Sequence, residues 1–378
     1  MLTTVAVRGY RSLRDVVLPL GPLTVVTGAN GSGKSNLYRA LHLLAATARE
    51  GAPAALAREG GLASALWAGP EQGGGTEGTV RRGPVRVALG VAGDDTGYAV
   101  ELGLPQADQR SAFARDPEVK EETVWGGAIA RPATVLTERR GPLVRTRDET
   151  GWATLTTTAR PHESMLDVVA DPRRSPELVT LREELRSWRL YDHLRTDAGA
   201  PARMPQPGSR TSALAPDGAD LAAALATIDE MGGRRDLTAA LDDAFGSRLE
   251  IAVREGTFEV LLHQPGLLRP LRAAELSDGT LRFLMVTAAL LTPRPPQLVV
   301  LNEPEQSMHP SLLPALARTI ARAARSTQVV VVTHSADLAG AVAEEGEEPL
   351  TVELAKTAGE TVVVGQDGPL DRPAWRWP

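Results

Sequence analysis

The chain has 378 residues, of which 42% are hydrophobic, so it can bury a substantial core in two domains or in one domain with an insertion. It contains no cysteine, which excludes disulfides, thiolate metal sites and cysteine nucleophiles and fits a reducing cytoplasm. The net charge of −6 argues against a protein that coats nucleic acid, and without a secretory leader or a membrane-length apolar run we expect a cytoplasmic protein with no membrane partner.

The first elements along the chain predict a hairpin that leads into a glycine-rich loop. Residues 2–8 alternate like an edge strand, residues 9–12 form a turn, and residues 16–20 supply the partner strand. Residues 23–27 are a short β-branched run typical of a buried strand, and residues 34–47 carry apolar side chains at helical spacing. Strand, glycine-rich loop and helix follow one another in the order that a phosphate-binding loop requires.

The loop between this strand and this helix matches every fixed position of a phosphate-binding loop, with the sequence Gly28-Ala29-Asn30-Gly31-Ser32-Gly33-Lys34-Ser35. Its glycines let backbone N–H groups turn inward around phosphates, and the helix directs its positive end toward them. We expect Lys34 to reach the β- and γ-phosphates and the Ser35 hydroxyl to ligate Mg²⁺. The residues expected to bind the nucleotide are Gly28, Asn30, Gly31, Ser32, Gly33, Lys34, Ser35 and Asn36.

The middle of the chain changes its pattern twice. From about residue 79 to residue 157 the pattern has period two, which predicts an antiparallel β meander with strands at 85–89, 98–102, 134–136, 143–145 and 153–155. Ser175-Pro176 then opens a predicted helix that extends to about residue 194, and residues 196–218 form a loop rich in proline, glycine and serine. Further expected elements are helices near 219–230 and 235–245 and strands near 248–254 and 257–262.

Polar residues follow two buried strands in the last third of the chain. Residues 298–301 form a buried strand that ends in Asn302 and Glu303, and residues 328–332 form another that ends beside His334. A carboxylate at the end of a parallel strand, beside a phosphate loop on another strand, stands where a catalytic base or a ligand of Mg²⁺-bound water is needed. These strand ends therefore predict a second part of the nucleotide site.

The order and spacing of these motifs resemble the head of ABC-type ATPases, specifically the branch of RecF- and SMC-like ATPases. The matching motifs are Walker A at 28–35, the signature at 276–280, Walker B at 298–303, the D-loop at 307–310 and the switch histidine at 334. The resemblance implies an α/β fold, namely a P-loop NTPase head with a parallel sheet core and an antiparallel β subdomain, with an inserted, largely helical lobe. The expected head covers 1–157 and 265–378, with the β subdomain at 79–157 and the lobe at 158–264.

In that family two heads dimerise around two ATP molecules, so the resemblance implies a homodimer with ATP and Mg²⁺ at its interface. Ser277 and Gly279 would contact the γ-phosphate of a nucleotide held by the second subunit. Glu303 would polarise the attacking water and His334 would contact the γ-phosphate, which with Lys34 completes the catalytic set. The resemblance also implies action on DNA in repair, recombination or defence against foreign DNA, with a separate effector protein.

Two positions depart from the family pattern. Asn302 stands where Walker B usually has aspartate, so its amide oxygen reaches Mg²⁺ only through a metal-bound water and brings no charge, which predicts slow hydrolysis. Asp278 replaces the first glycine of the signature pair and brings a negative charge toward the phosphates. Gln72 is a candidate for the Q-loop by its position only.

Other functions compete with a DNA-acting ATPase. One alternative is the ATPase subunit of a membrane transporter, against which the long insertion and the Asp278 signature argue. Another is a nucleotide-gated binding switch with little turnover, which Asn302 motivates. A nuclease of the OLD family would need a further metal-binding domain after His334, and the residues that follow are too few for one.

The remaining candidate residues have simpler interpretations. His309 is expected to cap the following helix or to contact the partner subunit. Trp375 and Trp377 are expected to anchor the C-terminal tail on the fold. Seven arginines are candidates for contacts with DNA phosphate, with solvated surface positions as the favoured interpretation: Arg139, Arg140, Arg145, Arg147, Arg182, Arg186 and Arg189.

Overall fold

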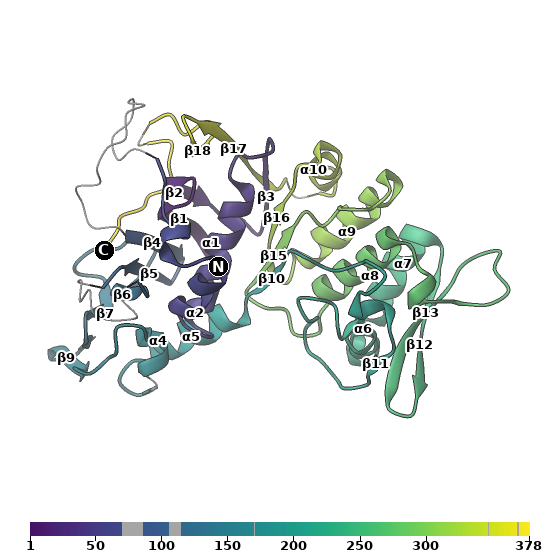
Figure 1. The fold of residues 1–378 in the computed structure, drawn as a ribbon, viewed down its shortest axis with the longest axis horizontal. Coiled ribbons are helices and arrows are strands. Elements are labelled where there is room, and N and C mark those ends of the chain that lie inside the picture. The colour runs from purple at the N-terminus through teal and green to yellow at the C-terminus, as the bar shows by residue number, and fades with distance from the viewer. Residues whose placement is uncertain (70–85, 106–114, 170, 347, 369) are drawn as a thin grey trace. The chain divides into compact units, whose positions relative to one another are not determined.

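The computed structural model describes residues 1–69, 86–105, 115–169, 171–346, 348–368 and 370–378. These residues form two compact units whose segments alternate along the chain. The first unit comprises Met1–Gly21, Gly28–Trp188 and Val352–Pro378, and the second comprises Pro22–Thr27 and Arg189–Thr351. Figure 1 labels their elements. No helix within the described residues is long and apolar enough to cross a membrane.

The first unit contains an antiparallel sheet whose strands follow the order β2-β1-β4-β5-β6-β7-β8-β9. The predicted N-terminal hairpin and the predicted meander are both present, and they join into this one sheet because β1 pairs with β4. Strand β6 was not among the sequence-predicted strands. The strands are β1 (Leu2–Tyr10), β2 (Leu13–Pro19), β4 (Arg86–Gly93), β5 (Thr96–Gly103), β6 (Glu118–Gly126), β7 (Val135–Arg140), β8 (Leu143–Asp148) and β9 (Gly151–Thr156).

Helices and a second hairpin complete the first unit. Helix α1 follows the glycine-rich loop as predicted and buries Leu37, Leu41 and Leu44 on one face. From Val352 onward, β17 (Leu350–Thr357) belongs to this unit and pairs antiparallel with β18 (Glu360–Val363). The helices are α1 (Lys34–Thr47), α2 (Ala52–Arg58), α3 (Leu62–Ala65), α4 (Met165–Val168) and α5 (Pro176–Ser187).

The predicted end of helix α5 was wrong. The sequence placed it near residue 194, but the helix ends at Ser187, and Trp188 has an extended backbone with φ −51° and ψ 142°. The next residues form β10 (Arg189–Tyr191), which pairs in parallel with β15 (Leu298–Asn302). Their backbone groups therefore bond to a distant strand, and that partner overrides the helical spacing of the local sequence.

The second unit is built on parallel strands in the order β10-β15-β16-β3. Strand β16 (Gln328–Val332) pairs in parallel with β15 on one side and with β3 (Leu23–Gly28) on the other. The strands are runs of valine and leucine, as expected for a parallel sheet covered on both faces. This arrangement confirms the predicted parallel core and brings the carboxyl ends of β3, β15 and β16 to one edge.

Helices and a small sheet complete the second unit. The buried core combines the parallel strands with the apolar side chains of α8, including Leu281, Phe283 and Met285. Strand β13 pairs with β11, β12 and β14, and the predicted loop over 196–218 contains the short elements η1 and β11. The remaining elements are η1 (Pro201–Arg203), β11 (Gln206–Pro207), α6 (Leu221–Ile228), η2 (Asp229–Gly233), α7 (Arg234–Phe245), β12 (Arg248–Arg254), β13 (Thr257–His263), β14 (Leu271–Arg272), η3 (Ala273–Glu275), α8 (Asp278–Leu290), η4 (Pro310–Leu312), α9 (Leu313–Ala323) and α10 (Ala336–Ala343).

Candidate functional site

The glycine-rich loop has a backbone that only glycine accommodates at two of its positions. Gly28 has φ +144°, and a Cβ atom there would lie 2.2 Å from the Leu354 carbonyl oxygen. Gly33 has φ +113°, and a Cβ atom there would lie 2.0 Å from Thr361 Oγ1. Thr361 in turn donates a hydrogen bond to the Ser32 carbonyl at 2.8 Å. The loop is therefore braced against the β17–β18 hairpin, and the glycines are needed for that contact.

The polar groups of this loop fit a phosphate group. Gly33 precedes helix α1 without a side-chain cap, and the first turn of the helix carries no acidic residue. The Ser32 hydroxyl is buried without a hydrogen-bond partner. Lys34 is 6% exposed, and its ammonium donates to the carbonyls of Gly28 at 2.5 Å and Ala29 at 3.1 Å. A helix N-terminus, an unpartnered hydroxyl and a cation around a glycine cradle form a binding arrangement for an anion.

The two residues after Lys34 lie in different surroundings. Ser35 is exposed. The Asn36 side-chain amide donates to Ser12 Oγ at 2.8 Å, and Ser12 and Thr361 share a hydrogen bond of 2.7 Å between their hydroxyls. Asn36 thus helps to brace the loop, while the Ser35 hydroxyl is open to solvent.

Glu303 and His334 are brought together at the carboxyl edge of the parallel sheet. The His334 imidazole Nδ1 lies 3.3 Å from Glu303 Oε1 and 3.8 Å from Glu305 Oε1. Glu303 has φ +47°, an uncommon conformation for a residue other than glycine, and its N–H donates to the Val332 carbonyl at 2.7 Å. The sheet therefore holds the Glu303 backbone in a strained conformation that directs this side chain next to His334.

Glu305 is a member of this cluster that the sequence did not single out. Its side chain is 8% exposed, and one carboxylate oxygen accepts a hydrogen bond from the Thr333 hydroxyl. The other oxygen is buried without a hydrogen-bond partner. A buried acceptor of this kind is costly unless it serves a bound group or a water. Within the described part of the chain, no three His, Asp or Glu side chains converge closely enough to hold a metal ion by themselves.

Arg282 links helix α8 to the same edge of the sheet. It is 4% exposed, and its guanidinium donates to the carbonyls of Leu194 at 2.9 Å, Glu303 at 3.0 Å and Asp192 at 3.4 Å. Burial lowers the pKa of Arg282 from its ordinary value, and the nearby carboxylates, that of Glu305 foremost, oppose this effect. No local pattern predicts this role for Arg282, because its partners come from separate segments of the chain.

Asn302 forms a hydrogen bond with a carboxylate on the neighbouring strand. Its amide Nδ2 donates to Asp192 Oδ1 at 2.6 Å. Asp192 directly follows β10, and its other carboxylate oxygen lies 3.2 Å from His193 Nε2. The carboxylate that is absent from position 302 is therefore present one strand away.

The predicted signature residues cap helix α8 and contact the D-loop. The Ser277 hydroxyl accepts a hydrogen bond from the Thr280 N–H at 3.1 Å, which makes Ser277 the N-cap of α8. A Cβ atom at Gly279 would lie 2.7 Å from the Ser307 carbonyl oxygen, so this glycine permits a close approach of two backbones within the chain. Asp278 is paired with Arg203 at 2.5 Å.

Other predicted residues are placed as follows. The His309 side chain accepts a hydrogen bond from the Ser311 N–H at 3.3 Å, which confirms its capping role. Lys34 and Ser35 belong to the first unit, whereas Asn302, Glu303, His334 and the signature belong to the second. Gln72 lies outside the described residues.

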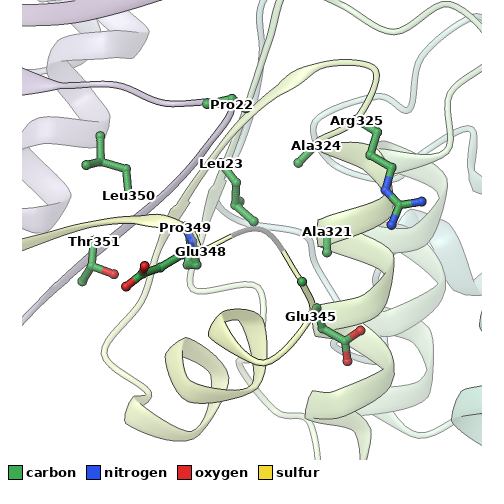
Figure 2. A pocket seen from close by; sticks show the side chains of 11 residues that line it. Pro22, Leu23, Ala321, Ala324, Arg325, Glu345, Glu348, Pro349, Leu350 and Thr351 are labelled. Carbon is green, nitrogen blue, oxygen red and sulfur yellow. The ribbon is translucent and has the colours of Figure 1, made fainter.

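A cavity of about 830 Å³ lies in the second unit (Figure 2). It opens at the amino ends of the strands, where its lining includes Leu23, the first residue of β3, and Leu350, the first residue of β17. Arg325, Glu345 and Glu348 supply charged groups to its wall. No predicted site residue lines this cavity, so the loop of the first unit and the strand ends of the second unit, each described by itself, are the candidate groups.

The arginines expected at a solvated surface do not form one patch. Arg139 is fully buried, and its guanidinium lies 3.3 Å from the buried carboxylate of Glu122, so the expectation of a surface position was wrong there. Glu122 also accepts hydrogen bonds from the Tyr98 hydroxyl and the Met165 N–H, which makes this position part of a core network. Arg189 belongs to β10 and not to helix α5.

The C-terminal tryptophans anchor the tail as expected. The Trp375 ring contacts Trp125 edge to face with their centroids 5.6 Å apart, and Trp377 contacts Trp375 in the same way at 5.2 Å. The Arg8 guanidinium lies over the Trp377 ring, 4.8 Å from its centroid. The tail therefore packs on the antiparallel sheet of the first unit.

A protein-family model and a known protein match parts of this sequence. A family model described as "AAA domain, putative AbiEii toxin, Type IV TA system" matches residues 23–124 and 166–339, which is most of the chain. A protein named "OLD nuclease" from Thermus scotoductus is 48% identical over 44 residues, which cover 12% of this chain and 8% of that protein. The chain thus matches less than a tenth of that relative.

Two solved structures share the fold. An Smc head bound to the C-winged helix domain of ScpA superposes with a TM-score of 0.52 and 14% identity, covering 96% of this chain and 97% of that chain. An Smc head with an extended coiled coil, bound to the C-terminal domain of ScpA derived from Pyrococcus furiosus, gives the same TM-score and identity and covers 95% of that chain. These likenesses confirm the predicted fold class of an α/β P-loop ATPase head.

Proposed function

The chain belongs to this family of AAA domains, in agreement with the resemblance to RecF- and SMC-like ATPases, and on that premise we propose that it binds and hydrolyses ATP with Mg²⁺. The observation that carries the proposal is the glycine cradle of residues 28–35, in which a buried Ser32 hydroxyl lacks a partner and Lys34 covers the loop carbonyls. In this proposal residues 1–157 and 265–378 form the ATPase head, and residues 158–264 form an inserted lobe.

In the proposed phosphoryl transfer, different residues bind the phosphates, hold the metal and activate the water. The loop amides and Lys34 would hold the β- and γ-phosphates. The Ser35 hydroxyl and, through a water, the Asn302 amide oxygen would hold the metal. Mg²⁺ supplies charge neutralisation on the phosphate oxygens. Glu303 orients the attacking water and accepts its proton, and His334, held beside Glu303, contacts the γ-phosphate.

We further propose that two copies of the chain dimerise around the nucleotide. Ser277 and Gly279 at the N-terminus of α8 would face the γ-phosphate bound by the other copy, where the helix dipole favours negative charge. DNA is the proposed target. The relative named as a nuclease and the family description that names a toxin–antitoxin system support repair, recombination or defence as the setting, with a separate effector.

The test is ATP turnover with and without duplex DNA, alongside nucleotide binding by calorimetry. Lys34→Ala should abolish binding. Glu303→Gln should bind ATP normally and lose at least about 100-fold in turnover, because the proton acceptor is gone. Glu344→Gln, an exposed acid on the same unit, is the matched control and should behave as the wild type. Wild-type protein that neither binds nor hydrolyses ATP would refute the proposal.

Dimerisation is tested on the variant that retains nucleotide. Glu303→Gln with ATP and Mg²⁺ should sediment as a dimer, and the same protein without nucleotide should sediment as a monomer. Ser277→Arg should bind ATP but stay monomeric, because a bulky cation would obstruct the facing phosphate. A dimer that forms equally well with Ser277→Arg would contradict the proposed interface.

A second function is favoured by Asn302. Without a carboxylate at that position the protein could act as a nucleotide-gated binding switch with little turnover. In that case ATP would drive dimerisation in the wild type as it does in Glu303→Gln, and phosphate release would stay at background with and without DNA.

A further inference from the structure

We propose that Asp192 orients Asn302 and supplies the negative charge that the strand end of β15 lacks. The proposal rests on the proposed function, because the Mg²⁺–nucleotide complex is the group that Asn302 would serve. In this arrangement Asp192 is a positioning residue. The family pattern has aspartate at position 302. Here asparagine stands at that position, and Asp192 faces it from the end of the next strand.

The register of the sheet places the two side chains opposite each other. Strands β10 and β15 are parallel neighbours, with Tyr191 paired to Leu301. The residues that follow, Asp192 and Asn302, therefore leave the sheet at the same edge, and their side chains meet at 2.6 Å. Asn302 directly precedes Glu303, the proposed acceptor of the water proton, and Arg282 donates to the backbone carbonyls of both Asp192 and Glu303.

The chemistry of the pair determines which way the amide faces. A carboxylate can only accept hydrogen bonds, so only the NH₂ side of the Asn302 amide can bond to Asp192. The carbonyl oxygen, which is the side that accepts from a metal-bound water, must then face away from Asp192. The charge-assisted hydrogen bond thus selects one of two orientations that an isolated asparagine would adopt about equally.

Two basic side chains lie beside Asp192. The Arg282 guanidinium, which is buried, lies on one side and donates to the Asp192 backbone carbonyl at 3.4 Å. The His193 imidazole lies 3.2 Å from Oδ2, and the Asp192 side chain is 26% exposed. The carboxylates of Glu303 and Glu305 also act on Arg282 and oppose additional negative charge nearby. An aspartate at position 302 would add a second carboxylate at hydrogen-bond distance from Asp192, and the two like charges would repel each other.

Restoring aspartate, the residue of the family pattern, at position 302 should weaken the site. Asn302→Asp should weaken Mg²⁺-dependent binding of a non-hydrolysable ATP analogue by about tenfold, because a charge-assisted hydrogen bond is replaced by repulsion. Asp192→Asn should weaken it to a similar degree, because the Asn302 amide loses its fixed orientation. The exchanged protein, Asp192→Asn with Asn302→Asp, should recover binding to within about threefold of the wild type, since one carboxylate and one amide are again paired.

The experiment measures nucleotide affinity by calorimetry with Mg²⁺ and with EDTA, and the thermal unfolding midpoint of every variant without nucleotide. Asn302→Asp should lower that midpoint, and the exchange should restore it. Asp116→Asn, an exposed aspartate in the first unit, is the control for loss of one charge. The unfolding midpoints test the pair without reference to the nucleotide.

Each outcome has one meaning. Recovery in the exchanged protein, in both affinity and unfolding midpoint, supports the proposal. Asn302→Asp that binds as well as the wild type, or an exchange no better than either single variant, overturns it. If the wild type binds no nucleotide, the proposed function fails. If the exchanged protein also does not recover the wild-type unfolding midpoint, the pairing of Asp192 with Asn302 is overturned as well.

Discussion

Arg203 is predicted to hold the signature motif in place. It comes from η1, in the loop before α6, and its side chain is 9% exposed. The guanidinium donates to the Thr196 carbonyl at 2.9 Å, to the Leu276 carbonyl at 2.6 Å and to the Asp278 carboxylate at 2.5 Å. One buried cation thus connects the loop with both residues that flank Ser277.

Truncation of Arg203 should cost far more than truncation of its acidic partner. Arg203→Ala removes hydrogen bonds from a charged donor and leaves partly buried carbonyls unsatisfied, so we expect a loss of about 3 kcal/mol in the free energy of unfolding. Asp278→Ala should cost less than about 1 kcal/mol, because its side chain is 56% exposed and solvent screens the ion pair. The asymmetry follows from the carbonyl contacts, which Asp278→Ala leaves intact.

Urea unfolding followed by circular dichroism is the suitable assay. Circular dichroism follows the helices of both units, whereas the tryptophans all lie in the first unit: Trp67, Trp125, Trp152, Trp188, Trp375 and Trp377. With an m-value of about 3 kcal/mol/M, Arg203→Ala should lower the midpoint by about 1 M. Arg210→Ala, an exposed arginine of the same loop, is the control and should change stability by less than about 0.5 kcal/mol. Equal losses for Arg203→Ala and Asp278→Ala would refute the reasoning.

Three further predictions concern the first unit. Gly33→Ala should lower ATP affinity at least about tenfold and cost about 1–3 kcal/mol of stability, because its φ of +113° and the Thr361 hydroxyl exclude a methyl group; calorimetry and urea unfolding measure both effects. His42→Gln should flatten the loss of stability that the wild type shows on acidification from pH 7.5 to 5.5. The pKa of His42 lies below its ordinary value of 6.5, chiefly because the imidazole is buried. The unfolded chain therefore binds a proton at a higher pH than the folded chain, and the free energy of unfolding decreases as the pH drops below 6.5. Arg139→Met should cost about 3–5 kcal/mol, read from tryptophan fluorescence during unfolding, because the Glu122 carboxylate stays buried without its cation.

Each of these predictions has a matched control. Gly31→Ala has a comparable positive φ but open space around the added methyl, so its effect on stability should be smaller than that of Gly33→Ala. His162→Gln changes an exposed histidine and should alter the free energy of unfolding by less than about 0.5 kcal/mol. Arg140→Met changes an exposed neighbour of Arg139 and should cost less than about 0.5 kcal/mol. Equal effects in a variant and its control would contradict the corresponding prediction.

The fold was predictable where the signal is local. The glycine-rich loop, the hairpin before it and the valine-rich strands each carry their pattern within a few residues. The sequence-based prediction made helix α5 too long, because the apolar spacing of the helix continues to Trp188. The actual end depends on pairing with β15, more than a hundred residues later. Strand β6 was missed because Glu122 looks like a surface residue until Tyr98 and Arg139 are seen to satisfy it.

Asn302 and Asp278, which depart from the motif pattern, show that comparing a motif position by position overlooks the residues that contact it. Asn302 removes a charge and Asp278 adds one, and each change has a partner that local sequence cannot reveal. Asp192 lies 110 positions from Asn302 and contacts it at 2.6 Å, and Arg203 lies 75 positions from Asp278 and contacts it at 2.5 Å. At each position a side chain from another segment brings the opposite change in charge. Asp192 supplies the negative charge that Asn302 lacks, and Arg203 neutralises the negative charge that Asp278 adds. A substituted motif residue is therefore best judged together with the side chains it contacts, and the exchange of Asp192 with Asn302 applies that criterion directly.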